Sequence, residues 1–244
     1  MTRFTQSIVN LTRLTSLSTR VLADVAGTTA LVQRPPSYTV PAFVNLGVAG
    51  YFGGGASGPL SGIDKITFNG DTKTTLSATL STARHSLSGM AKSGVAGYIG
   101  GGRNPSQVQT SVIDKITFPG DTKTSLAATL TAAVRNHAAM ANSGVAGYFA
   151  GGDLVSSYTT TIDKITFPAD SKTTLAATLT AGVQFPSGMA SSGVAGYIGG
   201  GYNGASYVNG IDKIAFPADA KTTLSATLTS ARQGTAAMAN SGVL

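Results

Sequence analysis

The chain lacks three residue types on which many functional sites depend. Its 244 residues include no cysteine and no tryptophan, and every one of its 10 acidic residues is an aspartate, so glutamate is absent as well. Without cysteine there is no disulfide framework and no thiol nucleophile. A zinc centre needs three or four ligands, and two histidines with scattered aspartates supply them poorly. We therefore expect no metal and no other cofactor.

Long apolar runs are also missing. A membrane-spanning helix needs about 20 consecutive apolar residues, and no such run occurs in the sequence. Serine, threonine and arginine interrupt residues 8–22, so the N-terminus lacks the charged region and apolar core of a secretory signal. The sequence predicts neither a membrane span nor secretion by a signal peptide.

Charge is sparse and regularly placed. Only 11% of the residues are charged, and the formal net charge is +7. Most lysines recur at fixed spacing, each within two residues of an aspartate: Lys65, Lys73, Lys115, Lys123, Lys164, Lys172, Lys213 and Lys221. A nucleic-acid surface needs clustered basic residues with stacking aromatics, which this pattern does not provide. We expect these lysines to be neutralised by the neighbouring aspartates, and we predict no nucleic-acid partner.

What the sequence does contain is an internal repeat. The motif Gly-Val-Ala-Gly-Tyr-Phe-Gly-Gly-Gly at residues 47–55 returns at 94, 144 and 193 with small changes, and begins again at 242. A second motif, Ile-Asp-Lys-Ile, starts at residues 63, 113, 162 and 211. A period of about 49 residues indicates a repeat architecture.

Each repeat is predicted to hold about four short strands. In the first copy we expect strands at 48–52, 63–68, 74–80 and 85–92, with a turn at 69–72, because threonine-rich alternating segments and glycine turns disfavour helix. One such sheet cannot bury both of its faces, whereas sheets stacked side by side in a ring bury them and leave no open edge. The sequence therefore predicts an all-β fold and a β-propeller. An open β-solenoid is the alternative, although its coils are usually shorter.

The order of these motifs resembles the kelch repeat of β-propellers over residues 40–244. The shared features are a glycine pair after a strand, an aspartate near a hydrophobic strand, and an arginine before the next inner strand. The arginines are Arg84, Arg135 and Arg232, with Gln184 in the third position. The tryptophan of the kelch pattern is replaced by Leu76, Leu126, Leu175 and Leu224. The near-identity of the copies is also similar to kelch-like structural and tail-associated proteins of marine bacteriophages, which implies a place in a virion.

The chain is divided into an N-terminal extension, residues 1–38, and a propeller, residues 39–244. The repeats are assigned to residues 39–80, 84–130, 134–179 and 183–228, with a partial one at 229–244. We expect four full blades and a composite fifth blade from both termini, to which residues 20–32 contribute strands. A four-bladed ring with a free arm, and a blade shared between two subunits, are the rivals. The extension is either a short amphipathic helix or an extended arm, and it carries Arg3, Arg13, Arg20 and Arg34.

The loops of the repeat divide into two classes. Because antiparallel strands alternate the side on which loops emerge, the long loops 56–62, 103–111, 153–161 and 202–210 share a face with the short segments around residues 85, 136, 184 and 233. These loops differ between copies, while those of the other face are nearly the same. Binding residues usually lie on loops of a rigid scaffold, although such loops also drift without selection. The candidate binding residues are Arg103, Asn104, Tyr158, Tyr202, Asn203 and Tyr207.

No catalytic constellation is evident. His85 and His137 occupy offset positions in adjacent copies, and we expect them to be partly exposed loop residues. Asp64 and its copies at 114, 163 and 212 have oxygen ligands that suit calcium, but each stands beside a lysine, which favours a turn or salt-bridge role. The glycine triplets lack the Lys-Ser/Thr pair of a phosphate loop. We expect no enzyme activity and no catalytic residue.

These observations lead to a functional hypothesis. We predict a non-enzymatic structural and interaction protein of a virion, such as a fibre, decoration or tail-associated component. Its basic extension would bind other virion proteins, within a larger assembly, and its variable loops would face outward. One alternative is a carbohydrate-binding propeller lectin that recognises a host glycan or surface protein. Another is a cellular protein-interaction scaffold.

Overall fold

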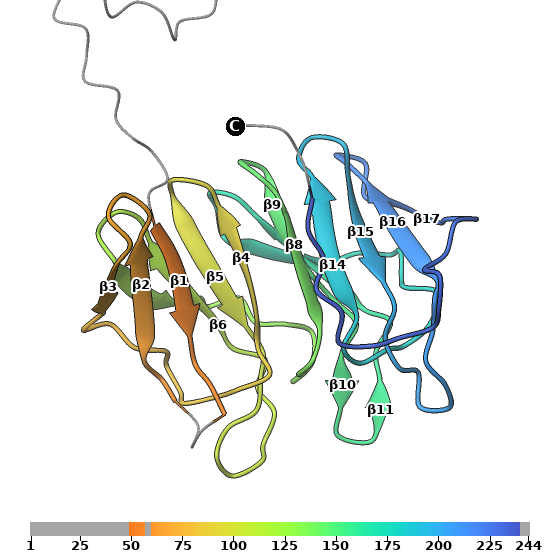
Figure 1. Cartoon of the computed structure of the whole chain (residues 1–244), viewed down its shortest axis with the longest axis horizontal. Coiled ribbons are helices and arrows are strands. Elements are labelled where there is room, and N and C mark those ends of the chain that lie inside the picture. Colours follow the sequence, from red (N-terminus) through yellow and green to blue (C-terminus); the bar gives the residue numbers. More distant parts are fainter. Residues whose placement is uncertain (1–48, 57–59, 240–244) are drawn as a thin grey trace, which may run out of the picture. The chain divides into compact units, whose positions relative to one another are not determined.

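The computed structural model describes residues 49–56 and 60–239, all of which belong to one compact unit, Asn45–Leu244. These residues form strands, turns and loops without any helix, which confirms the predicted all-β class (Figure 1). No helix in this part of the chain is therefore long and apolar enough to cross a membrane. The predicted arm or helix at 1–38, the strands expected from residues 20–32 and the four arginines of the extension lie outside the described residues.

The described strands form four main antiparallel sheets and one small hairpin. The first sheet has the order β1-β2-β3, and the others have the orders β4-β5-β6-β7, β8-β9-β12-β13 and β14-β15-β16-β17. The bounds in the first two sheets are β1 Ala49–Gly53, β2 Ile63–Thr67, β3 Thr72–Thr75, β4 Ser88–Lys92, β5 Ala96–Gly100, β6 Ile113–Thr117 and β7 Thr122–Ser125. Those in the third and fourth are β8 Ala138–Asn142, β9 Ala146–Ala150, β12 Ile162–Thr166, β13 Ser171–Thr174, β14 Ser187–Ser191, β15 Ala195–Gly199, β16 Ile211–Ala215 and β17 Ala220–Thr223.

Each sheet repeats one pairing scheme. The Ala-Gly-Tyr strand pairs with the Ile-Asp-Lys-Ile strand, so that Tyr98 lies opposite Lys115 in the second sheet. Residues three apart in a strand point to opposite faces of the sheet. Ile113 and Ile116 are nevertheless both buried, because neighbouring sheets cover the two faces of this one. This is why the motif is apolar at both of its ends.

Three details differ from the expected strands. The fourth strand of the repeat, expected at 85–92, begins only at Ser88. The third strand of the repeat is Thr72–Thr75 rather than 74–80. Beyond it the amide of Leu80 donates to the carbonyl of Ser61, so the chain leaves the ladder and Leu80 enters the core. The hairpin of β10, Asp153–Leu154, and β11, Ser157–Tyr158, was not anticipated.

Consecutive sheets are joined by a polar junction that occurs three times. In one copy the Tyr98 hydroxyl donates to Asp170 Oδ1 at 2.7 Å, and Lys115 Nζ lies 2.6 Å from Asp170 Oδ2. Burial, together with the hydrogen bond to Asp170, raises the pKa of the Tyr98 hydroxyl. Equivalent junctions join Tyr51 and Lys65 to Asp121, and Tyr148 and Lys164 to Asp219. The prediction that each of these lysines is neutralised by the adjacent aspartate is therefore wrong, because the partner lies in the next sheet.

Apolar contacts fill the same junctions. The Tyr98 ring stacks on Phe167 with centroids 4.9 Å apart. Met90 of β4 lies over Gly147 of β9, and a Cβ atom built on that glycine would be 2.1 Å from the Met90 sulfur. Met140 lies over Gly196 in the same way. The glycine before the tyrosine of the motif thus leaves space for a methionine side chain of the preceding sheet.

Candidate functional site

The structure brings the two classes of variable loop together. Short antiparallel bridges join His85 to Arg103, Arg135 to Asp153, and Gln184 to Tyr202. In each pair the first residue belongs to a crossover, the segment that connects the preceding sheet to this one. The second residue directly follows the glycine pair or triplet at the end of the Ala-Gly-Tyr strand. The prediction that the long and short variable segments share one face is confirmed for these three repeats.

Three of the predicted binding residues form an aromatic cluster on this face. The ring of Tyr158, at the end of β11, lies 6.1 Å from that of Tyr202, and the Tyr202 ring lies 5.5 Å from that of Tyr207. Gln184 Nε2 donates to the Tyr158 hydroxyl at 3.2 Å. Tyr207 keeps 54% of its surface exposed. We call Tyr158, Tyr202 and Tyr207 the tyrosine cluster.

The loop that carries this cluster is held by its own polar groups. Asn203 Oδ1 accepts hydrogen bonds from the amides of Ala205 and Ser206 at 3.0 and 2.8 Å. The Tyr202 hydroxyl donates to the carbonyl of Gly204 at 2.8 Å. The Asn203 amide oxygen therefore shapes the loop, and Tyr207 is the exposed member of the cluster.

The other two predicted binding residues lie in a different loop. Arg103 Nε donates to the carbonyl of Gln107 at 3.0 Å, and Asn104 Oδ1 accepts from the amide of Val108 at 2.9 Å. Among the described residues no hydrogen bond or aromatic contact connects this loop to the tyrosine cluster. Arg103 and Asn104 thus order their own loop and are not part of the cluster.

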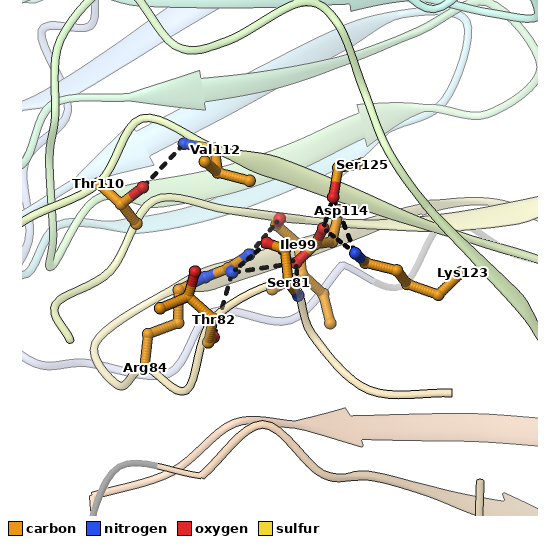
Figure 2. A network of polar contacts seen from close by, with 9 residues as sticks. All are labelled: Ser81, Thr82, Arg84, Ile99, Thr110, Val112, Asp114, Lys123 and Ser125. Carbon is orange, nitrogen blue, oxygen red and sulfur yellow. Dashed lines mark hydrogen bonds and ion pairs between the residues drawn. The ribbon is translucent and has the colours of Figure 1, made fainter. Parts of the chain in front are cut away.

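A buried ion pair lies where the first crossover meets the second sheet (Figure 2). Arg84 and Asp114 have fully buried side chains, and Arg84 Nη1 is 3.0 Å from Asp114 Oδ2. Asp114 also accepts from the amide and hydroxyl of Ser81, both at 2.9 Å, and from Ser125 at 2.7 Å. Burial raises the pKa of Asp114, but these hydrogen bonds and the guanidinium charge outweigh burial and hold it below its usual value.

This network corrects the arginine pattern expected from the kelch resemblance. When the copies are aligned on Met90 and Met140, Arg84 coincides with the buried Val134, while Arg135 falls one residue later. There Arg135 pairs with Asp153 on the loop face, at 2.7 Å. Arg84 and Arg135 therefore have different roles.

The aspartates equivalent to Asp64 in the later repeats accept hydrogen bonds from the crossovers between sheets. Asp163 accepts from the amide and hydroxyl of Thr131, and Asp212 does the same for Thr180. Each also accepts from a lysine and a threonine of its own sheet. These contacts agree with the predicted turn and salt-bridge role. Within residues 49–56 and 60–239, no three His, Cys, Asp or Glu residues lie close enough to hold a metal ion.

His137 is buried rather than partly exposed as expected. It is 4% exposed, and neither ring nitrogen has a hydrogen-bond partner among the described residues. It borders a small cavity lined also by Phe149, Thr161 and Asp163. Burial lowers the pKa of His137 to about 4, against a smaller raising effect of Asp163. Leu87 occupies the equivalent place in the second sheet, so the sequence offered a signal that this position is apolar.

Comparison with known proteins gives a fold neighbour and no family. No family model matches the chain, and no curated protein matches it. Among solved structures, YjhT is similar with a TM-score of 0.55 and 14% sequence identity, over 67% of this chain and 52% of that chain. The chain thus matches about half of the length of YjhT. At this identity the likeness concerns the fold alone.

Proposed function

We propose that this protein is a non-enzymatic recognition and structural component of a virion, whose four sheets are blades of a kelch-like β-propeller. The observation that carries the proposal is the contrast between its parts. The junctions between sheets repeat the same tyrosine, lysine and aspartate contacts three times, whereas the loops of one face differ and gather the tyrosine cluster. Uniform junctions maintain a scaffold, and divergent aromatic loops suit a partner without the symmetry of the repeat.

The tyrosine cluster favours carbohydrate as the ligand class on the variable face. Tyrosine rings present an apolar surface with a polar edge, which suits the faces and hydroxyl groups of a sugar ring. Tyr207 is exposed and accessible to a ligand, while the Gln184 amide orders Tyr158 and the carbonyl of Gly204 orders Tyr202. The basic extension, residues 1–38, would bind other virion proteins and leave this face outward.

A glycan array probed with the purified full chain tests this proposal. We expect one class of saccharide to bind, and we expect Tyr202→Ala to weaken that binding by between about fivefold and about 150-fold, since loss of an aromatic contact costs about 1–3 kcal/mol. Val194→Ala is the matched control, because Val194 is exposed on the turn between β14 and β15 at the other end of the sheet. A chain lacking residues 1–38 should keep the sugar and lose incorporation into particles. Binding that Tyr202→Ala leaves unchanged would contradict the role of the cluster.

A further inference from the structure

The first sheet exposes side chains that are buried in the other sheets. Phe52 of β1 is 71% exposed, whereas Phe149, its equivalent in β9, is 3% exposed. Phe68 is 60% exposed, whereas Phe167 is 8% exposed and stacks on a tyrosine of the preceding sheet. Exposed aromatic residues gathered on one face indicate a surface that is covered by another element. We call the side of the first sheet that carries Phe52 and Phe68 the entry face.

The polar residues of the entry face also lack their usual partners. Asp71 has a positive φ of 49°, as Asp121 has one of 53°, but the described residues supply Asp71 with neither the tyrosine nor the lysine of a junction. The Asp64 side chain is 43% exposed and pairs with Lys73, while the Asp114 side chain is 0% exposed. Asp64 is exposed because the described residues place no crossover amide and hydroxyl upon it.

The fourth sheet presents the complementary set. Tyr197 and Lys213 lie opposite each other in β15 and β16, as Tyr98 and Lys115 do in the second sheet. Among the described residues the structure gives neither of them the aspartate that the other three junctions supply. The crossover that leaves β17 carries Thr229, the equivalent of Thr180. We call this side of the fourth sheet, with that crossover, the exit face.

The crossover also carries an arginine without its carboxylate. Arg232 aligns with Arg84, which is buried against Asp114 of the following sheet. Arg232 itself is exposed and donates only to Ser230 among the described residues. By analogy with Arg84 and Asp114, the carboxylate partner of Arg232 would be an aspartate of a sheet that packs against the fourth sheet.

The glycines that leave space for a side chain of a neighbouring sheet are unpartnered on the same two faces, among the described residues. Gly100 receives Phe149 from the following sheet, where a Cβ atom would lie 2.8 Å from the ring. Gly199 is the corresponding position of the fourth sheet, and among the described residues the atoms near its missing Cβ belong to Gly210 and to Ile211 of the same sheet. In the first sheet, the described residues place only Phe68 against Gly50, whereas a methionine of the preceding sheet lies over the equivalent glycine in the third and fourth sheets.

We propose that the exit face of one copy of this chain binds the entry face of a second copy, and that this contact reproduces the junction between consecutive sheets. The pairs expected are Tyr197 and Lys213 with Asp71, Tyr197 with Phe68, Met189 with Gly50, Phe52 with Gly199, and Thr229 and Arg232 with Asp64. Every pair repeats a contact that one or more junctions within the chain already make.

The partner is a second copy because, within residues 49–56 and 60–239, the chain's own two faces do not meet. The described residues satisfy all three internal junctions at once, and none of the expected pairs forms between the first and fourth sheets. A second copy meets the requirement without disturbing any junction. The contact is head-to-tail, so it generates a closed ring if the rotation closes and a filament if it does not.

Engineered cysteines in the full chain test this contact, since the chain has no cysteine of its own. Thr131 and Thr174 have hydroxyls 2.6 Å apart across an internal junction, and Thr229 and Thr75 are the equivalent positions on the exit and entry faces. We expect a mixture of Thr229→Cys and Thr75→Cys chains in a glutathione redox buffer to give a disulfide-linked dimer with one copy of each. There are two controls. A single chain with Thr131→Cys and Thr174→Cys should form an internal disulfide, whereas a mixture of Thr229→Cys and Ser125→Cys chains should form no disulfide between chains.

The mass in solution provides an independent reading. The full chain should exceed its 24.5 kDa monomer mass by light scattering. Asp71→Lys should lower the association at least about tenfold, and addition of Lys213→Asp to the same chain should restore it by exchanging the charges. Two results would overturn the proposal. One is that a chain carrying both Thr75→Cys and Thr229→Cys forms an internal disulfide and keeps the monomer mass. The other is that a mixture of Thr75→Cys and Thr229→Cys chains forms no disulfide.

Discussion

Replacing Asp114 with alanine is expected to destabilise the protein by about 3–5 kcal/mol, the cost of leaving a buried charge without its partner. Arg84 would remain fully buried with its guanidinium unpaired, and the Ser81 amide would lose its acceptor. The free energy of unfolding from urea denaturation, followed by circular dichroism, measures the loss.

Replacing Arg84, the other member of the ion pair, with valine should change the free energy of unfolding little. Val134 and Val183 occupy the position of Arg84 in the next two copies and are buried. In Arg84→Val the carboxylate of Asp114 would keep Ser81, Ser125 and Lys123, so we expect a change within about 1 kcal/mol. The double variant should be more stable than Asp114→Ala alone, because it removes the stranded charge. Equal losses for the two single variants would contradict the assignment of the Asp114→Ala loss to the unpaired charge of Arg84.

Replacing His137 with leucine is expected to remove an acid sensitivity of folding. The histidine pKa is about 4 in the folded protein and about 6.5 in the unfolded chain. The unfolded chain therefore binds a proton first as the pH falls, and stability declines between about pH 6.5 and pH 4. At about 1.4 kcal/mol for each unit of pKa, the loss reaches about 3 kcal/mol. The leucine variant should lack this decline.

Leucine is a fitting replacement because Leu87 fills the equivalent site. It also removes two ring nitrogens that have no hydrogen-bond partner among the described residues, so we expect a gain of about 1–3 kcal/mol at neutral pH as well. Urea midpoints of both proteins at pH 4.5 and pH 7 measure both effects. A pH dependence that is the same in the two proteins would contradict the assignment to His137.

The repeat allowed the strands to be predicted, because its local patterns determine them. The Ala-Gly-Tyr and Ile-Asp-Lys-Ile strands lie within one residue of the expected bounds. The pairing of variable loops could also be foreseen, since alternation in an antiparallel sheet requires it. Propeller closure and the virion setting stay predictions.

Contacts between sheets could not be foreseen in the same way. Lys115 stands next to Asp114 in the sequence but pairs with Asp170, which is 55 residues away. Local spacing favours the neighbour, whereas side chains that alternate along a strand point to opposite faces and meet different sheets. The offset between Arg84 and Arg135 was missed for a related reason, because a one-residue shift moves a side chain from the core to the loop face.

The central claim is that the repeated tyrosine and aspartate hold consecutive sheets together. A double-mutant cycle on Tyr98→Phe and Asp170→Ala tests it most directly, because the two side chains are 72 residues apart and meet only across the junction. We expect a coupling free energy of about 0.5–3 kcal/mol from urea denaturation. Losses that add within about 0.3 kcal/mol would contradict the claim.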